Sequence, residues 1–265
     1  MKKLFTLFVA ILCAAAIHAA NYSGTLPVLH INTENSTPIT SKEYYLNGTY
    51  YLDNLGIEGY KSIGSANEPL TLKIKGRGNY TFTGFDKKPY RLKLDAKAAL
   101  LGMKKSKHFA LLAHADDNLG FLRNTMGFEL SRRGGLDFTP EQRPVEVVLN
   151  GEYIGLYFLT ETIRVDSDRV KITEQADNIS DPEEITGGWL VEIDNYWDAD
   201  QITINEGNGE LIRLTYKSPE VLSDAQSDPI LKPPPPQPTA PSTQTTNHRP
   251  SGKTSSTSTR SPRSI

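Results

Sequence analysis

The chain contains very little cysteine and tryptophan, with one and two residues respectively among 265. The only cysteine, Cys13, lies in an apolar run near the N-terminus. The remaining sequence therefore has no thiol for nucleophilic catalysis, for a disulfide or for a cysteine-bound zinc ion. Outside this N-terminal run, no apolar stretch is long enough to predict a transmembrane helix. Stability is thus expected to come from an ordinary hydrophobic core.

The N-terminal segment, residues 1–20, has the order of a signal peptide. Lys2 and Lys3 precede an apolar run over residues 4–17, and small residues follow at Ala19 and Ala20. This order of charged, apolar and small residues is typical of secretion signals, and the run is short for a membrane span. We expect the mature chain to start near residue 21 and to be secreted, cell-surface or periplasmic.

The C-terminal segment, residues 228–265, lacks acidic residues after Asp228 and has few apolar ones. Nine of the 17 prolines and five basic residues lie at or after Pro229, among many Ser and Thr residues. Such a composition buries too little surface to offset the entropy of ordering, so it predicts a disordered tail. All 31 acidic residues precede Pro229. The acidic body, residues 21–227, argues against general nucleic-acid binding.

The body contains mainly strand signals. Asn-Gly dipeptides in 'YYLNGTYYL' (residues 44–52) and 'VEVVLNGEYIGLYFL' (145–159) predict two tight hairpins. Between them, 'LTLKIKGRGNYTF' (70–82) and 'YRLKLD' (90–95) alternate apolar and charged residues, as half-buried strands do.

Helical spacing occurs once clearly, in residues 116–135. Asp116 or Asp117 offers an N-cap, and Gly134 follows as a stop. The apolar residues expected to face the core are Leu119, Leu122, Met126 and Leu130. A second helix start is indicated at Ser218, which precedes a proline. Mostly strands, with one convincing helix, predict an α+β fold.

Several charged residues are candidates for binding or chemistry. Arg77 lies between two glycines in 'GRGN', a pattern that suits a phosphate site or a plain turn. The nearby basic residues, which suit an anionic ligand or a solvated strand face, are Lys87, Lys88, Arg91 and Lys93. Glu161 follows a strongly apolar strand, where a carboxylate is costly unless it meets a cation or a metal ion.

Other candidates suggest different classes of site. Glu192 and Asp194 alternate along one strand, and either could form the carboxylate pair of a glycoside hydrolase with Glu161, so this function remains an alternative. Trp189, Tyr196 and Trp197 are candidates for a surface on which a sugar stacks. His114 precedes Asp116 and Asp117, which a helix cap explains more simply than a metal site.

Seven motifs in register resemble the N-terminal part of the CotH kinase family, named for spore coat protein H. The resemblance covers about residues 72–220. Its motifs are 'GRGNYTF', 'KKPYRLKLD', 'LLGMKKSKHFALLAHADD', 'LGFLRNTMGFELSRR', 'VEVVLNGEYIGLYFLTETI', 'TGGWLVEID' and 'YKSPE'. It implies an atypical protein-kinase-like fold that uses ATP and Mg²⁺ or Mn²⁺ to phosphorylate Ser or Thr on extracellular or coat proteins.

The resemblance also implies roles for individual residues. Arg77, Lys88, Arg91 and Lys93 would face the nucleotide phosphates, and Glu161 would pair with a cation or organise the site. The family's 'N-E-x-x-K-N-x-D' segment, which supplies the catalytic Asp, and its 'W-D-F-D' segment, which supplies a metal-binding Asp, do not occur in this sequence. No catalytic residue is therefore assigned, and the metal ligands are unknown.

The missing segments predict that the helical C-terminal lobe is absent and that this polypeptide is inactive as a kinase. A frameshift or misjoined gene end explains the change of composition near residue 228, and a linker or glycosylated stalk is the rival explanation. Apolar surface that the missing lobe would cover predicts poor solubility. The alternative function is a secreted binding module for a glycan or protein partner. The sequence does not indicate the oligomeric state.

Overall fold

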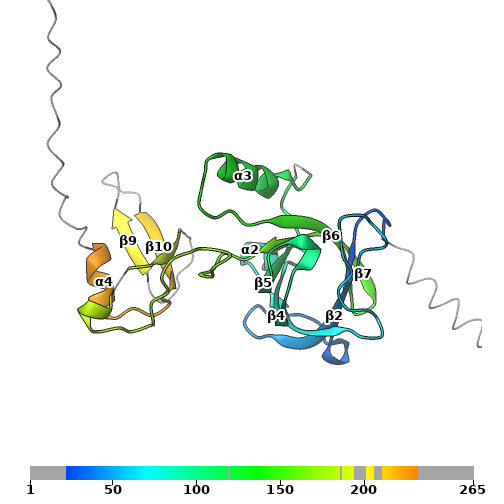
Figure 1. Cartoon of the computed structure of the whole chain (residues 1–265), viewed down its shortest axis with the longest axis horizontal. Helices are drawn as coiled ribbons and strands as arrows, with labels where there is room; N and C mark the ends of the chain where they lie inside the picture. The colour runs from blue at the N-terminus through cyan, green and yellow to red at the C-terminus, as the bar shows by residue number, and fades with distance from the viewer. Residues whose placement is uncertain (1–21, 119, 186, 194–200, 206–210, 232–265) are drawn as a thin grey trace, which may run out of the picture.

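The computed structural model describes residues 22–118, 120–185, 187–193, 201–205 and 211–231. These form a closed barrel and a separate three-stranded sheet, joined by residues 162–189 (Figure 1). The barrel strands are β1 (Val28–Thr33), β2 (Leu46–Asp53), β3 (Leu70–Gly76), β4 (Tyr90–Ala98), β5 (Ser106–Leu112), β6 (Gln142–Leu149) and β7 (Glu152–Glu161). The predicted β-rich α+β fold is confirmed to this extent.

Parallel pairing between the first and sixth strands closes the barrel. The strand order is β1-β2-β3-β4-β5-β7-β6, and every other neighbouring pair is antiparallel. Strand β1 lies beside β6 from the Val28–Glu146 pair to the Ile31–Leu149 pair. Closure leaves no barrel strand with an unpaired edge, so the strands are protected from edge-to-edge association.

Alternation along β3 and β4 fills the barrel and also charges its outer surface. Leu72 and Leu92 are almost fully buried inside, whereas Arg91 and Lys93 on the same two strands are exposed. Because successive strand residues point to opposite faces, the apolar positions build the core and place the basic positions outside. The predicted alternation is confirmed for Leu70–Gly76 and Tyr90–Asp95, but it is wrong for the end of the first segment, where Tyr80–Thr83 forms the helical turn α2.

The Asn-Gly hairpin between β6 and β7 is confirmed, but the earlier one is wrong. Asn150 and Gly151 have φ angles of 53° and 81°, as a tight hairpin turn requires. Strand β2, in contrast, continues through Asn47 and Gly48 without turning. A Cβ atom at Gly48 would lie 2.5 Å from the carbonyl oxygen of Asn32. This glycine therefore allows β1 and β2 to approach closely and makes no turn.

The predicted central helix is α3 (Leu122–Arg133), shorter at its start than expected. Its N-cap position is Phe121, in the left-handed conformation, and not an aspartate. Asp117 nevertheless accepts a hydrogen bond from the backbone N–H of Arg123 at 3.0 Å. The distant aspartate thus satisfies one of the helix's first N–H groups. The helix ends before Gly134, as predicted.

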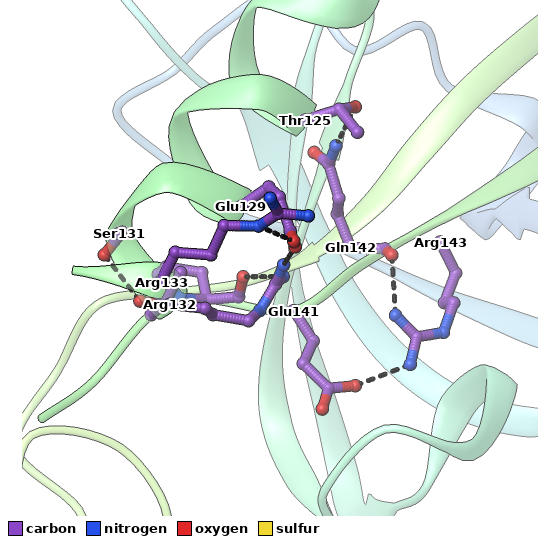
Figure 2. Close-up of polar contacts among 10 residues, drawn as sticks. Thr125, Glu129, Ser131, Arg132, Arg133, Glu141, Gln142 and Arg143 are labelled. Carbon is purple, nitrogen blue, oxygen red and sulfur yellow. Dashed lines mark hydrogen bonds and ion pairs between the residues drawn. The ribbon is translucent and has the colours of Figure 1, made fainter. Parts of the chain in front are cut away.

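The apolar stripe of α3 does not face the core, contrary to the prediction. Leu122, Met126 and Leu130 are 50%, 58% and 67% exposed. The helix instead makes polar contacts, some of them shown in Figure 2: the Gln142 side-chain amide of β6 donates to Thr125 Oγ1 at 2.6 Å, and the hydroxyls of Ser131 and of Thr139 in the following loop lie 2.6 Å apart. The stripe residue Leu119 lies outside the described residues.

The second sheet has the order β8-β10-β9 and carries the last helix. Its elements are β8 (Leu190–Ile193), β9 (Gln201–Asn205), β10 (Leu211–Ser218) and α4 (Asp224–Leu231). The helix predicted to start at Ser218 is wrong in position, because Ser218 ends β10. The N-cap is Ser223, whose Oγ accepts a hydrogen bond from the Gln226 N–H at 3.1 Å.

Only short helical turns complete the fold. They are η1 (Glu34–Ser36), α2 (Tyr80–Thr83), η2 (Leu100–Gly102) and η3 (Pro182–Glu184). The helix α3 lies over one end of the barrel in Figure 1, apart from the second sheet. The described part of the chain is thus dominated by strands, and Figure 1 shows the second sheet set apart from the barrel.

Replacing Gly48 by Ala is expected to lower the free energy of unfolding by about 1–3 kcal/mol, because the added methyl group overlaps β1 backbone. Gly127→Ala is the matched control. It lies in α3 with no heavy atom within 4 Å of an added Cβ, so it should stabilise by up to about 1 kcal/mol. Urea unfolding of both variants measures this. Equal effects would contradict the close approach at Gly48.

Candidate functional site

A pocket of about 520 Å³ lies between the barrel and the second sheet. Its apolar part includes Leu112, Phe128 and Leu190, and its charged part includes Arg77 and Glu161. The other residues of its wall are Arg91, Ala110, Asn124, Pro140, Thr160, Thr162, Ile163, Val191, Glu192 and Lys217. The volume and the mixture of apolar and charged groups suit a small organic ligand.

Backbone contacts hold the loop that carries Arg77. The Gly76 N–H donates to the Ser41 carbonyl at 2.9 Å, and the Arg77 N–H donates to the Pro89 carbonyl at 3.1 Å. A Cβ at Gly76 would overlap the ring of Phe82, so a glycine is required for this ring to pack on the strand end. The first glycine of 'GRGN' therefore shapes the loop, and Arg77 projects from a fixed backbone.

Arg77 is a half-buried cation beside another cation. Burial lowers its pKa, Arg91 lowers it further, and Glu192 opposes both effects. No described carboxylate lies within ion-pair distance of Arg77 or Arg91. A bound anion would stabilise the charged form of both arginines, because no described side chain forms an ion pair with them.

Glu161 forms a buried ion pair at the end of β7. Its Oε1 lies 2.7 Å from Nη1 of Arg169, and the two side chains are 3% and 1% exposed. Its Oε2 accepts a hydrogen bond from the Glu141 N–H at 3.0 Å. Burial raises the pKa of Glu161, and this hydrogen bond and Arg169 act in the opposite direction. The expected cation partner of Glu161 is therefore Arg169.

Arg169 is not fully satisfied by this pair. The approach of Nη1 to Glu161 is a close charge contact whose angle is poor for a hydrogen bond, and Nη1 also donates to the Asp168 carbonyl at 3.2 Å. Its Nε and Nη2 are buried without a hydrogen-bond partner among the described residues. The pair thus holds residues 162–169 against the barrel mainly by electrostatic attraction in a dry environment.

A second pocket of about 340 Å³ adjoins the first and shares Arg91 with it. Lys93, His108 and Arg164 also line it. The pKa of His108 is lowered to about 4, first by burial and then by Arg164, Lys93, Arg91 and Lys107. The imidazole therefore lies in a region of positive potential.

Lys88 is the predicted phosphate-facing residue that the structure does not bring to these two pockets. It lines a separate pocket with Glu152 and Tyr153. Its Nζ lies 5.7 Å from the centre of the Phe82 ring. Strand β4 begins only at Tyr90, so Lys88 is not part of the alternating outer face that carries Arg91 and Lys93.

His114 lines a smaller pocket of about 170 Å³ with Asp116, Asp117 and Arg77. Burial lowers its pKa, partly opposed by the two aspartates. The described residues contain no group of three His, Cys, Asp or Glu side chains that would hold a metal ion. The hydrogen bond that Asp117 accepts from the Arg123 N–H supports the interpretation that Asp117 serves the start of α3.

The remaining candidates are only partly described. Glu192 lies 3.4 Å from Lys217 in an exposed ion pair, and both line the larger pocket. Trp189 is half-buried, with its indole Nε1 inside the protein. Asp194, Tyr196 and Trp197 lie outside the described residues, so the carboxylate pair and the aromatic surface stay predictions. No helix within the described part of the chain is long and apolar enough to cross a membrane.

Three residues of the site were missed by sequence reasoning: His108, Arg164 and Arg169. Arg164 lies three residues beyond Glu161, where β7 has already ended, so strand alternation gave no signal for it. Arg169 lies in a segment without periodicity, 'VDSDRV', and reaches Glu161 only because the chain folds back after β7. No local pattern identifies such a partner.

Breaking the Glu161–Arg169 pair should destabilise the protein strongly, because it leaves one uncompensated buried charge. Glu161→Gln or Arg169→Met is expected to cost about 3–5 kcal/mol, and the double variant less than the sum of the two. The control is Arg133→Met, which breaks an exposed pair with Glu129 and should change stability far less. Chemical unfolding measures all four; additive single effects would contradict the coupling.

The pH dependence of stability should contain a contribution from His108. Its folded-state pKa of about 4 lies below the ordinary value of 6.5, so the unfolded state binds more protons between these values. Stability should therefore fall as pH falls from about 6.5 to about 4. His108→Asn should make stability depend less on pH in this range. Lys93→Met should bring the folded-state pKa of His108 closer to 6.5, so stability should fall over a smaller pH range. An unchanged slope in His108→Asn would contradict this assignment.

The family of the chain follows from a comparison with known proteins. A family model described as CotH kinase protein matches residues 73–225, which extend from β3 to the start of α4 and include every residue that lines the first pocket. A search of curated proteins returned no match. Because the matched residues are more than half of the chain, the protein belongs to the CotH kinase family.

Proposed function

We propose that this chain is a secreted, nucleotide-binding member of the CotH kinase family. The nucleotide binds between the barrel and the second sheet, in the pocket of about 520 Å³. The observation that supports this proposal most directly is Arg77, a half-buried cation that faces Arg91 without a described ion-pair partner. A nucleotide supplies the missing negative charge.

The lining of the pocket divides into two parts that suit a nucleotide. Leu112, Phe128 and Leu190 offer apolar contact to a base. Arg77 and Arg91 offer planar guanidinium groups to the first phosphate, a geometry in which arginine makes two parallel hydrogen bonds. Glu161, held by Arg169, closes the same pocket. Its buried carboxylate keeps the segment that carries Arg169 against the pocket wall.

The family relationship suggests phosphoryl transfer to Ser or Thr of an extracellular or surface protein, with ATP and Mg²⁺ or Mn²⁺. When bound, the metal ion would neutralise phosphate charge. The described residues do not fit this requirement, because they contain no cluster of metal-binding side chains. No acidic residue follows Asp228 in the sequence. We therefore propose that this polypeptide binds ATP but does not transfer its phosphate, and that the barrel is part of a kinase-like β-rich lobe.

Nucleotide binding is testable by isothermal titration of the full chain with ATP. Arg77→Met and Arg91→Met should each weaken binding by roughly 10- to 100-fold, the value of a charge-assisted hydrogen bond. The matched control is Arg133→Met, an exposed arginine that lines none of the described pockets. Absence of ATP binding in the unaltered chain, or equal loss in all three variants, would contradict the proposal.

Phosphoryl transfer is tested separately with labelled ATP, magnesium or manganese, and a casein-like acceptor. We expect no labelled protein, because the family's catalytic and metal-binding aspartate segments do not occur in this sequence. Autophosphorylation of the unaltered chain that requires the added metal ion would show that the polypeptide is active. That result would overturn the proposed inactivity and leave the binding proposal intact.

A further inference from the structure

We infer that the second pocket, lined by Arg91, Lys93, His108 and Arg164, binds the outer phosphates of a nucleotide. In this assignment Arg164 makes the site prefer a nucleoside triphosphate to a monophosphate. The inference rests on the proposed nucleotide pocket and adds a specificity-determining residue to it. Arg164 lies outside the sequence motifs of the family resemblance, and His108 lies within one of them but was given no role there.

The two pockets form a continuous path along the outer face of the barrel. Both are lined by Arg91, Thr162 and Ile163, and both reach Leu190 of β8. Arg91 pairs with Ala110 and Lys93 pairs with His108 across β4 and β5, so these side chains follow one another along the same strands. A phosphate chain that starts at Arg91 therefore continues directly toward Lys93.

Positive charge exceeds negative charge in the second pocket. Its cations are Arg91, Lys93, Arg164 and Lys217, and its carboxylates are Glu174 and Glu220. Lys217 pairs with Glu192 of the first pocket. In the described part of the chain, Arg91, Lys93 and Arg164 form no ion pair with any carboxylate. Three cations thus line the pocket without a close counter-charge.

Two further observations point to an anionic ligand. The Nε of Arg164 is buried without a hydrogen-bond acceptor among the described residues, which is an uncommon state for a guanidinium group. The pKa of His108 is lowered first by burial and then by Arg164, Lys93 and Arg91, so these three charges also act on the imidazole in the pocket wall. A phosphate group in this pocket would accept from Arg164 and relieve the repulsion among the cations.

Phosphate of the bound nucleotide explains these features better than an independent anion. The second pocket is not isolated, because Arg91 lines both pockets. One ligand that spans them would therefore contact Arg91 with its inner phosphate and the cations of the second pocket with its outer phosphates. A monophosphate reaches Arg77 and Arg91 only. A triphosphate extends into the second pocket and gains Lys93 and Arg164, so its additional affinity should depend on Arg164.

The test compares four ligands, adenosine, AMP, ATP and inorganic tripolyphosphate, on the full chain by isothermal titration. We expect ATP to bind roughly 10- to 100-fold more tightly than AMP, as expected for one further charge-assisted hydrogen bond. Arg164→Met should remove most of this difference and change AMP affinity less than about twofold. Arg133→Met is the charge-matched control, and Lys93→Met is a second variant on an exposed strand position if Arg164→Met is unstable.

A second readout is the pKa of His108, measured by its imidazole NMR signals. ATP and tripolyphosphate should raise it, because a nearby phosphate favours the imidazolium form, whereas adenosine should leave it unchanged. A merely structural role of Arg164 would not produce this difference between ligands. The same shift with adenosine and ATP would overturn the inference.

The binding outcomes separate the two proposals. Equal affinity for AMP and ATP would overturn the role of Arg164 while the nucleotide pocket stands. Binding of tripolyphosphate without adenosine or AMP would support an anion site and overturn the nucleotide pocket. Absence of binding by all four ligands would overturn both.

Discussion

The buried ion pair between Glu161 and Arg169 is the interaction on which the arrangement of the site depends. Glu161 ends the last barrel strand, and Arg169 belongs to the segment that leads to the second sheet. Their contact is 2.7 Å long and almost inaccessible to water. Two charges are removed from water at considerable cost, and each compensates the other only while the segment stays against the barrel. The pair therefore fixes one wall of both pockets.

The barrel supplies the opposite wall through the alternation of β4. Leu92 and Leu94 point into the core, so Arg91 and Lys93, which alternate with them, point outward. Closure of the barrel orients that outer face toward residues 162–164. Core packing and ligand recognition are thus coupled in one strand, and a shift of one residue in its register would exchange the two faces.

Local patterns predicted structure well where local chemistry was sufficient. The Asn150–Gly151 hairpin and the end of α3 before Gly134 depend on neighbouring residues only, and both predictions are confirmed. Gly48 misled the prediction, because it lies within β2, where it allows close contact with the neighbouring strand β1. The apolar stripe of α3 is exposed for a similar reason: the contact of Thr125 with Gln142 of β6 places a polar side of the helix against the barrel.

The sequence by itself determined the strand-rich class, the family relationship and the charged positions Arg77, Arg91, Lys93 and Glu161. Only the tertiary structure separated Lys88 from these residues and brought Arg164 and His108 into the same pocket. It also identified Arg169 as the partner of Glu161. The physical reason is the distance along the chain over which each kind of interaction acts. Periodicity and turn chemistry act over a few residues, whereas the walls of this site meet through strand pairing and a buried charge contact between residues that no local pattern relates.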